Sequence, residues 1–519
     1  MSINVRKESM YEVYDVIVIG SGIGGLSAAS LLSLAGKKVL VLERHDRPGG
    51  YAHSFRRGYY NFDAAVHLVA GCSKGGLIDA LLRTLSVREN CEFIRTDPLY
   101  KTSFPDLCLE APLGREEFFE TYAAIFPAEK QNLSRLMETI EKMYSEMMQF
   151  PSEPNLLDFV RAIRKSPTLT RYSRATLQEV MDKYVEDYKL KSAFSSLWPY
   201  LGLPPSRLSF LYWCAMLSSY LDEGAFYCKG TFQNFVSALV SALQTKGGEL
   251  MLRTRVERIM VKDGITTGVK LENGEIIRAS IVISNADATQ TFVEMVGEEK
   301  LPRAYMGKLH KMKPSLSAFV VFLATDLDLS SLEARHEMFY YNSWDHERAY
   351  ESILRGEISS PSSNFILNVP TLTDPSLAPK GQHLMTATTL VPYDIANSWR
   401  EEKQSFGDKL VQQVESKVPG LKGRILMMEG ATPRTMERYT LNLTGSIYGW
   451  EVSPPQVGPG RLGHRTPIKG LYLSGHWTQP GGGIYGVVVS GVQTAQTILG
   501  YRNIESMFRE LGGRNLNGM

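Results

Sequence analysis

The chain has 519 residues, of which 43% are hydrophobic and 22% are charged, a composition typical of an ordinary folded protein rather than a disordered or fibrous one. Lys and Arg number 57 against 55 Asp and Glu, and the resulting formal charge of +2 argues against nucleic acid as a partner. The length exceeds what one hydrophobic core usually organises, so we expect two or three substructures that share a ligand.

The beginning of the chain predicts a cytoplasmic protein. The first residues carry charges and no apolar run, so neither a secretory signal nor an Arg- and Ser-rich transit peptide is recognised. The five cysteines are scattered, form no CxxC pair and are expected to be reduced thiols. No apolar stretch reaches the roughly 18 residues that a membrane-spanning helix needs.

Residues 15–43 predict a strand, a glycine turn, a helix and a second strand. VIVIG is a short β-branched run typical of a buried parallel strand, and LSAASLLSLAG is typical of a helix that ends at a glycine. Gly20, Gly22 and Gly25 form a GxGxxG motif between the two elements. Such glycines permit a tight turn, a close approach of the backbone to a pyrophosphate, and packing of helix on strand. Glu43 ends the second strand, where a carboxylate can accept hydrogen bonds from ribose hydroxyls.

The same glycine spacing occurs twice more, at 458–463 and 481–486. Prolines before and within the first of these segments argue against a preceding strand, so it is interpreted as a surface loop. The second segment precedes an expected helix and is interpreted as a turn that approaches a ligand. Neither has the context of a second Rossmann turn, so one dinucleotide site is expected.

Residues 116–245 are expected to form a helical insert, because segments such as KQNLSRLMETIEKMYSEMMQF carry apolar residues at steps of three and four. Within it, residues 208–221, LSFLYWCAMLSSYL, are apolar and aromatic but too few to span a bilayer. Three interpretations stay open for this segment: a buried core helix, the wall of a lipid pocket, or a helix at a membrane surface.

The rest of the chain predicts strands and a final helix. Residues 246–310 contain several strands, with a turn at 272–274 between two of them. Residues 311–430 mix strands such as LSAFVVFLATDL with proline-containing loops and are expected to form a substrate-side layer. Residues 431–519 contain the strand GLYLSG, a glycine cluster and an apolar helix. The nucleotide-binding part is thus expected in three pieces, which are residues 1–115, 246–310 and 431–519.

The N-terminal stretch VIVIGSGIGGLSAASLLSLAGKKVLVLERHDRPGGYAHSF resembles the extended FAD fingerprint of amine oxidases and phytoene desaturases. FDAAVHLVAG, ATPRTMERYTLNLTGSIYGW and TPIKGLYLSGHWTQPGGGIYGVVVSGVQTA extend the resemblance to the group of phytoene desaturases, carotenoid cis-trans isomerases and retinol saturases. It covers both ends of the chain and the region of Val256, whereas the helical middle matches only in length and character. The resemblance implies an α/β fold: a Rossmann-type FAD-binding domain, a mixed β-sheet substrate domain and a helical insert.

By the same resemblance and motifs, FAD is the expected cofactor. The residues expected to contact it are Gly20, Gly22, Gly24, Gly25, Glu43, Arg44, Arg47, Gly49, Gly50, Val256, Ala286, Gly475, His476, Gly483 and Ile484. Many relatives have an acidic residue after the glycine of the last strand, where this chain has His476, so a flavin contact by that side chain stays open. The helix that follows PGGGIYG would direct its positive end at the flavin and favour the negative charge of the reduced form, unless the turn only serves packing.

Four residues are candidates for catalysis: Glu437, Arg438, Tyr448 and His67. A carboxylate such as Glu437 beside a flavin in an apolar tunnel would have its pKa raised by desolvation, which suits proton transfer, although a structural ion pair with a neighbour is an equal alternative. His67 lies in an apolar stretch and is either a group that faces the flavin or a core histidine. The histidines show no metal-ligand spacing, so no metal is expected.

The expected function is hydride exchange at flavin N5 with carbon-carbon bonds of a long, apolar, carotenoid- or retinoid-like polyene. An amine oxidase-like enzyme and a noncatalytic, FAD-stabilised lipid-binding protein are the alternatives. Because such a polyene dissolves in lipid, peripheral association with a membrane surface through residues 208–221 is expected, with Phe210, Tyr212, Trp213 and Tyr220 at the headgroup boundary.

Overall fold

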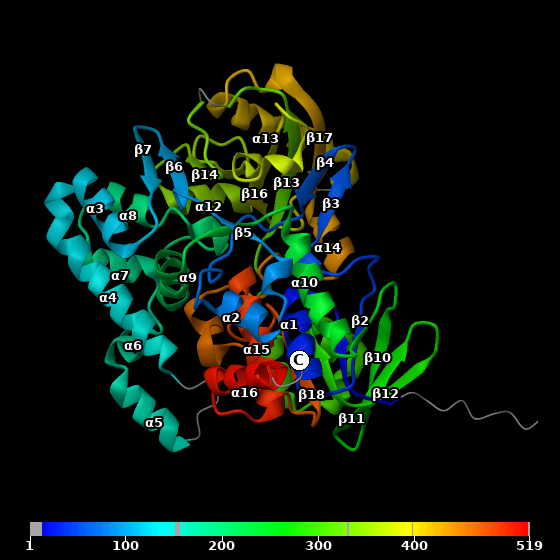
Figure 1. The fold of residues 1–519 in the computed structure, drawn as a ribbon. Coiled ribbons are helices and arrows are strands. Elements are labelled where there is room, and N and C mark those ends of the chain that lie inside the picture. Colours follow the sequence, from blue (N-terminus) through cyan, green and yellow to red (C-terminus); the bar gives the residue numbers. More distant parts are fainter. Residues whose placement is uncertain (1–12, 151–155, 330–331, 397, 517–519) are drawn as a thin grey trace, which may run out of the picture.

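The computed structural model describes residues 13–150, 156–329, 332–396 and 398–516. Two seven-stranded sheets form the framework of this part of the chain. In Figure 1 the first sheet lies below the second, and the helices of residues 115–194 extend along one side of both. The α/β fold class predicted from the sequence is confirmed.

The first sheet is built around β1 (Val13–Ile19), the strand that precedes the glycine turn. Its last four residues are buried, because parallel neighbours flank it on both sides: β12 (Ile276–Ser284) and β2 (Val39–Leu42). The strand order is β10-β11-β12-β1-β2-β9, and β18 pairs in parallel with β12. The remaining bounds are β9 (Glu249–Met251), β10 (Val256–Lys262), β11 (Ile265–Leu271) and β18 (Leu471–Leu473). Strands far apart in the sequence therefore meet beside β1.

Helix α1 (Ile23–Leu34) is buried along nearly its whole length between two other helices. On one side lies α10 (Phe232–Thr245), where the Ser30 hydroxyl donates to the Leu239 carbonyl at 2.9 Å. On the other lies α15 (Ile484–Leu499), and a Cβ on its Gly491 would overlap the carbonyl oxygen of Gly24. Helix α10, at the end of the predicted insert, therefore covers the helix of the glycine motif.

The second sheet has the order β17-β13-β16-β15-β14-β6-β7 and is antiparallel except where β14 pairs with β6. Its bounds are β6 (Tyr100–Phe104), β7 (Leu107–Ala111), β13 (Ser317–Thr325), β14 (Glu337–Tyr341), β15 (Asn364–Asn368), β16 (His383–Val391) and β17 (Ile425–Ala431). Strand β13 is buried along its whole length, which explains its continuous apolar sequence. Strands β6 and β7 lie within the first predicted segment, 1–115, yet pair in this sheet.

Most of the described residues between 116 and 245 lie in helices. The helices are α3 (Arg115–Ile125), α4 (Lys130–Met148), α5 (Leu156–Lys165), α6 (Pro167–Tyr172), α7 (Leu177–Tyr184), α8 (Tyr188–Phe194) and α9 (Phe210–Glu223). Other elements are β3 (Ser54–Arg57), β4 (Tyr60–Asp63), β5 (Phe93–Arg95), β8 (Phe226–Cys228), α2 (Leu77–Thr84), α11 (Arg303–Leu309), α12 (His346–Leu354), α13 (Trp399–Lys417), α14 (Pro433–Thr440) and α16 (Ile504–Leu516).

Helix α9 corrects one expectation. The side chains of Phe210 and Trp213 are 0% exposed in a core that the helical region forms with the second sheet, so they do not lie at a surface. The aromatic composition that suits a headgroup boundary equally suits a buried helix, and packing decides the matter here. None of the helices in the described part of the chain is both long and apolar enough to span a bilayer.

Candidate active site

A cavity of about 780 Å³ lies between the two sheets. It extends from the glycine turn and Glu43, at the carboxyl ends of β1 and β2, to Ile366 and Thr388 of the second sheet. Carboxyl ends of parallel strands are the usual place for ligands in such folds, and the volume is within the range of ligand pockets. The predicted residues that line it are Gly20, Gly22, Gly24, Glu43, Arg44, Arg47, Gly49, Gly50, His67, Val256, Ala286, Tyr448, Gly475, His476, Gly483 and Ile484.

The glycines of the motif have different neighbours. A Cβ on Gly22 would lie 2.6 Å from the side-chain nitrogen of Asn285, and one on Gly24 would lie 2.9 Å from the backbone nitrogen of Gly475. A Cβ on Gly25 would lie 2.5 Å from the carbonyl oxygen of Gly20, so Gly25 serves the packing of α1 on β1 rather than the cavity wall. Asn285, directly after β12, lies against this turn, and no motif in the sequence singled it out.

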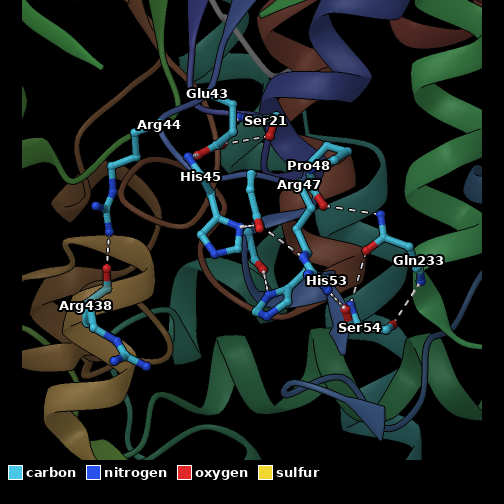
Figure 2. Close-up of polar contacts among 12 residues, drawn as sticks. Ser21, Glu43, Arg44, His45, Arg47, Pro48, His53, Ser54, Gln233 and Arg438 are labelled. Atoms are coloured by element: carbon cyan, nitrogen blue, oxygen red, sulfur yellow. Dashed lines mark hydrogen bonds and ion pairs between the residues drawn. The ribbon is translucent and has the colours of Figure 1, made fainter. Parts of the chain in front are cut away.

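Glu43 is held by three hydrogen bonds (Figure 2). Its Oε2 accepts from the backbone N–H of Ser21 at 2.9 Å and from the Ser21 hydroxyl at 2.7 Å, and its Oε1 accepts from the backbone N–H of His45 at 2.8 Å. The residue is 9% exposed. A carboxylate offers about four acceptor positions, so a ribose hydroxyl can still donate to it.

The two arginines after Glu43 are anchored differently. The guanidinium of Arg44 donates to the carbonyl of Arg438, which ties the end of β2 to α14 (Figure 2). The guanidinium of Arg47 donates to the carbonyl of Ser54 at 2.9 Å. The amide of Gln233 on α10 donates to the Pro48 carbonyl at 3.3 Å, so the Gly49–Gly50 turn is fastened from both sides.

The side chain of His476 is neutral, and its tautomer follows from its neighbours. The indole N–H of Trp477 donates to Asn442 Oδ1 at 3.0 Å, which fixes the orientation of the amide, and Asn442 Nδ2 lies 3.3 Å from His476 Nε2. Because the amide nitrogen donates, Nε2 is the acceptor and Nδ1 carries the proton. Burial lowers the pKa of His476 to about 3, with Arg461 adding to the effect. An uncharged imidazole therefore lies directly after Gly475 at the cavity wall.

Helix α15 begins at the cavity, and the glycine turn before it is bordered by two tyrosines. The hydroxyl of Tyr212 donates to the Gly482 carbonyl at 2.8 Å, and a Cβ on Gly482 would lie 2.8 Å from the backbone oxygen of Tyr448. Gly483 precedes the helix with a φ of 77°, a conformation that favours glycine. The positive end of the helix dipole is thus placed at the cavity wall, where it favours an anionic ligand.

At the second sheet the cavity wall contains one buried ion pair. His67 Nδ1 lies 3.1 Å from Glu337 Oε1, and Glu337 Oε2 accepts from Asn368 Nδ2 at 2.9 Å. Burial lowers the pKa of His67, but the carboxylates of Glu337 and Asp63 raise it, and the net pKa lies above the ordinary value. Glu337, which the sequence analysis missed, lies 270 positions from His67.

Glu437 and Arg438 do not lie among the residues that line the cavity. Glu437 is 39% exposed and accepts from the Tyr393 hydroxyl and from Arg434 at 3.3 Å. The side chain of Arg438 is exposed. Helix α14 turns Met436, Tyr439 and Thr440 toward the cavity instead. The carboxylate of Glu437 is therefore not desolvated beside the cavity, and it forms the structural ion pair with a neighbour, Arg434, that was the alternative interpretation.

These residues fit FAD. The glycine turn and the first turn of α1 can receive a pyrophosphate, and Glu43 and Val256 border the end where an adenosine would lie. The start of α15 and neutral His476 border the rest of the same wall. When bound, FAD supplies the capacity to accept or deliver a hydride, which ordinary side chains lack. Within the described ranges, no group of three or more His, Cys, Asp or Glu residues is arranged to hold a metal ion.

The comparisons with known proteins agree with FAD as the cofactor. The family model for flavin containing amine oxidoreductase matches residues 23–499, and the chain belongs to that family. It is an FAD-dependent oxidoreductase. The predicted resemblance to the phytoene desaturase, carotenoid isomerase and retinol saturase group is confirmed by the relatives that follow.

The chain is 30% identical to prolycopene isomerase 1 of an Oncidium hybrid cultivar, over 95% of this chain and 85% of that one. It is 28% identical to the neurosporene-forming phytoene desaturase of Rhodobacter capsulatus, over 93% of each chain. It is 24% identical to all-trans-retinol 13,14-reductase of Danio rerio, over 98% of this chain and 89% of that one. Its fold is similar to that of an oxidoreductase from Methanosarcina mazei, with a TM-score of 0.66 at 19% identity, over 93% of this chain and 100% of that one.

Proposed function

We propose that the protein exchanges a hydride between FAD and carbon-carbon bonds of a long, apolar polyene of carotenoid or retinoid type. The observation that carries this proposal is the extension of the cavity beyond the residues that fit the cofactor. One face of α9 lines the extension with Ala215, Met216 and Tyr220, and β13 adds Ala318 and Val320. An apolar tunnel of this kind suits a hydrocarbon chain. The names of the relatives, an isomerase, a desaturase and a reductase, support the same substrate class.

Within this function we assign the side chains by their position. Tyr448 lies beside the turn of α15, and its hydroxyl donates to the Pro199 carbonyl at 2.9 Å, so its ring is held as a wall that orients the polyene. His67 is the titratable group on the cavity wall that is best placed to hold a proton near the substrate. Glu437 and Arg438 support the site through α14 rather than through contact with the substrate.

We also propose that the polyene enters from lipid through an opening at the end of α4. Met147 and Met148 line the cavity there, and the side chain of Met148 is 64% exposed. An apolar rim of this kind can contact a bilayer without a spanning helix. Met148→Asp is expected to reduce binding to liposomes while FAD content stays unchanged. Equal cosedimentation of both proteins would contradict the proposed entrance.

The test of the function uses the FAD-loaded protein with a panel of cis and trans carotenoids and retinoids, oxidised and anaerobically reduced. Chromatography of the products then separates desaturation, saturation and isomerisation. Gly22→Trp, which fills the space beside Asn285, is expected to abolish both the yellow colour and the activity. Peroxide formation with amines and unchanged polyenes would favour an amine oxidase instead, and flavin that reacts with neither would favour a noncatalytic lipid-binding protein.

A further inference from the structure

Three polar aromatic side chains lie near one another on the cavity wall. His67 follows β4, Tyr200 lies between α8 and α9, Tyr220 is on α9, and all three line the cavity. The rings of His67 and Tyr200 lie 6.5 Å apart, edge to face. Behind them Glu337, 1% exposed, is the carboxylate that the three share as a neighbour. A purely hydrocarbon tunnel would have no need of this cluster.

The side chain of His67 presents its Nε2 to the cavity, and this nitrogen is a donor when the ring is protonated. Because Nδ1 is held by Glu337, Nε2 is the nitrogen left for a ligand, and none of the described residues accepts a hydrogen bond from it. The carboxylate is itself anchored by Asn368, so the imidazole cannot turn without breaking a buried pair. The raised pKa of His67 agrees with an imidazolium whose Nε2 bears a proton, although burial alone would remove that proton.

The two tyrosines supply further hydroxyls near Glu337, of which that of Tyr200 is a hydrogen-bonding neighbour of the carboxylate without normal hydrogen-bond geometry. The Tyr200 hydroxyl is buried and lacks a hydrogen-bond partner of normal geometry among the described residues, although burial and the nearby Glu337 raise the pKa of Tyr200. The Tyr220 hydroxyl makes no hydrogen bond to any residue in the part of the chain described here, and burial and Glu337 raise its pKa as well. A buried donor without a well-placed acceptor is costly, so the Tyr200 hydroxyl would gain from an acceptor that a ligand brings into the cavity, and the Tyr220 hydroxyl can donate to the same ligand.

We propose that the substrate is an oxygenated polyene, whose hydroxyl, carbonyl or carboxylate oxygen accepts hydrogen bonds from His67 Nε2 and from the hydroxyls of Tyr200 and Tyr220. This inference rests on the proposed function and narrows its substrate class. A hydrocarbon polyene fills the same volume but offers these groups no acceptor in the cavity. A site built to hydrogen-bond an oxygen discriminates strongly against the analogue that lacks it, more strongly than an apolar pocket can distinguish chain lengths.

The experiment measures binding to the FAD-loaded protein rather than turnover. All-trans-retinol, all-trans-retinal, all-trans-retinoic acid and the hydrocarbon in which hydrogen replaces the hydroxyl are titrated while the flavin absorbance and tryptophan fluorescence are followed. We expect at least one of the oxygenated ligands to bind at least tenfold more tightly than the hydrocarbon. The three oxygenated ligands distinguish a hydroxyl, a carbonyl and a carboxylate as the acceptor.

Variants then locate the contacts. Tyr220→Phe and Tyr200→Phe each remove one neutral donor without changing volume, and each should weaken binding of the preferred ligand about 2- to 12-fold. His67→Phe removes a charged donor and should weaken it about 12- to 160-fold. The hydrocarbon should bind equally to all variants. Tyr305→Phe is the matched control, since its hydroxyl is also buried without a partner but lies outside the cavity, and it should change no affinity.

Two results would overturn the inference. In the first, the hydrocarbon binds as tightly as every oxygenated ligand, or the tyrosine variants weaken the binding of oxygenated ligands and of the hydrocarbon alike. The donors then do not recognise an oxygen, and the proposed function stands without this refinement. If neither kind of polyene binds or reacts, the proposed function fails together with it. The two failures are therefore distinguishable in one set of titrations.

Discussion

Replacing Glu43 with Gln tests how the carboxylate at the end of β2 is used. Both of its oxygens accept from a backbone N–H, Oε2 from Ser21 and Oε1 from His45. An amide has one oxygen, so its NH₂ group must face one of these two N–H donors, whichever way it turns. The arrangement at Ser21 includes two hydrogen bonds, so the one at His45 is the cheaper to lose. The variant therefore loses one hydrogen bond to a charged acceptor and leaves a donor unpaired.

The loss of a hydrogen bond to a charged group costs about 1.5–3 kcal/mol, so we expect the free energy of unfolding of Glu43→Gln to fall by about 2–3 kcal/mol even without FAD. Urea unfolding of the apoprotein measures this change, and titration with FAD measures the loss of affinity on top of it. Asp15→Asn is the matched control, because Asp15 accepts from a backbone N–H, that of Lys38, through one oxygen, a role that an amide can keep. If Glu43→Gln is within about 0.5 kcal/mol of the wild type while the control is also neutral, the two-donor reasoning is wrong.

Three further changes test other parts of the structure. Gly491→Ala should lower the unfolding free energy by up to about 2 kcal/mol in urea titrations, since overpacking of α15 against α1 outweighs the gain in helix propensity, whereas Gly307→Ala, with open space around it, should stabilise by about 0.5–1 kcal/mol. The pKa of His67 is raised above 6.5, so the contribution of its pair with Glu337 is complete below that pH and is lost as the pH rises through the raised pKa. A double-mutant cycle with His67→Gln and Glu337→Gln should therefore give a larger coupling at pH 6 than at pH 9, and equal values would contradict the assignment. Trp213→Ser should lower the free energy of unfolding, measured in urea, by about 3–5 kcal/mol, because the ring is 0% exposed. A variant of unchanged stability would show that the ring is not in the core.

The nucleotide-binding turn could be predicted from the sequence because its causes are local. Gly20, Gly22 and Gly25 lie within six positions, and their spacing already fixes the turn, the close approach and the packing of the helix. Glu43 follows from the length of the same βαβ unit. Even here the partner of the turn, Asn285, could not be predicted, since only the pairing of β12 with β1 brings it to that place.

What the sequence could not show depends on contacts between distant segments. His67 was ambiguous until Glu337, 270 positions away, was seen beside it. The aromatic run of α9 allowed a core, a pocket wall or a membrane contact, and the structure shows that Trp213 belongs to the core while Tyr220 belongs to the wall. Whether Glu437 faces the cavity could not be predicted, because α14 carries polar and apolar residues side by side, and helical rotation alone decides which of them face inward.

The position of β1 at the middle of its sheet has a consequence for synthesis on the ribosome. The strand emerges first, but its partner β12 is not complete until residue 284, and α15, which covers α1, is not complete until residue 499. A nascent chain therefore carries an unpaired edge of β1 through about half of its elongation, and one side of the apolar helix α1 stays uncovered through almost all of it. We expect the need for chaperones to end only after α15 has left the ribosome, and a chain that stops short of α15 to aggregate rather than to retain FAD.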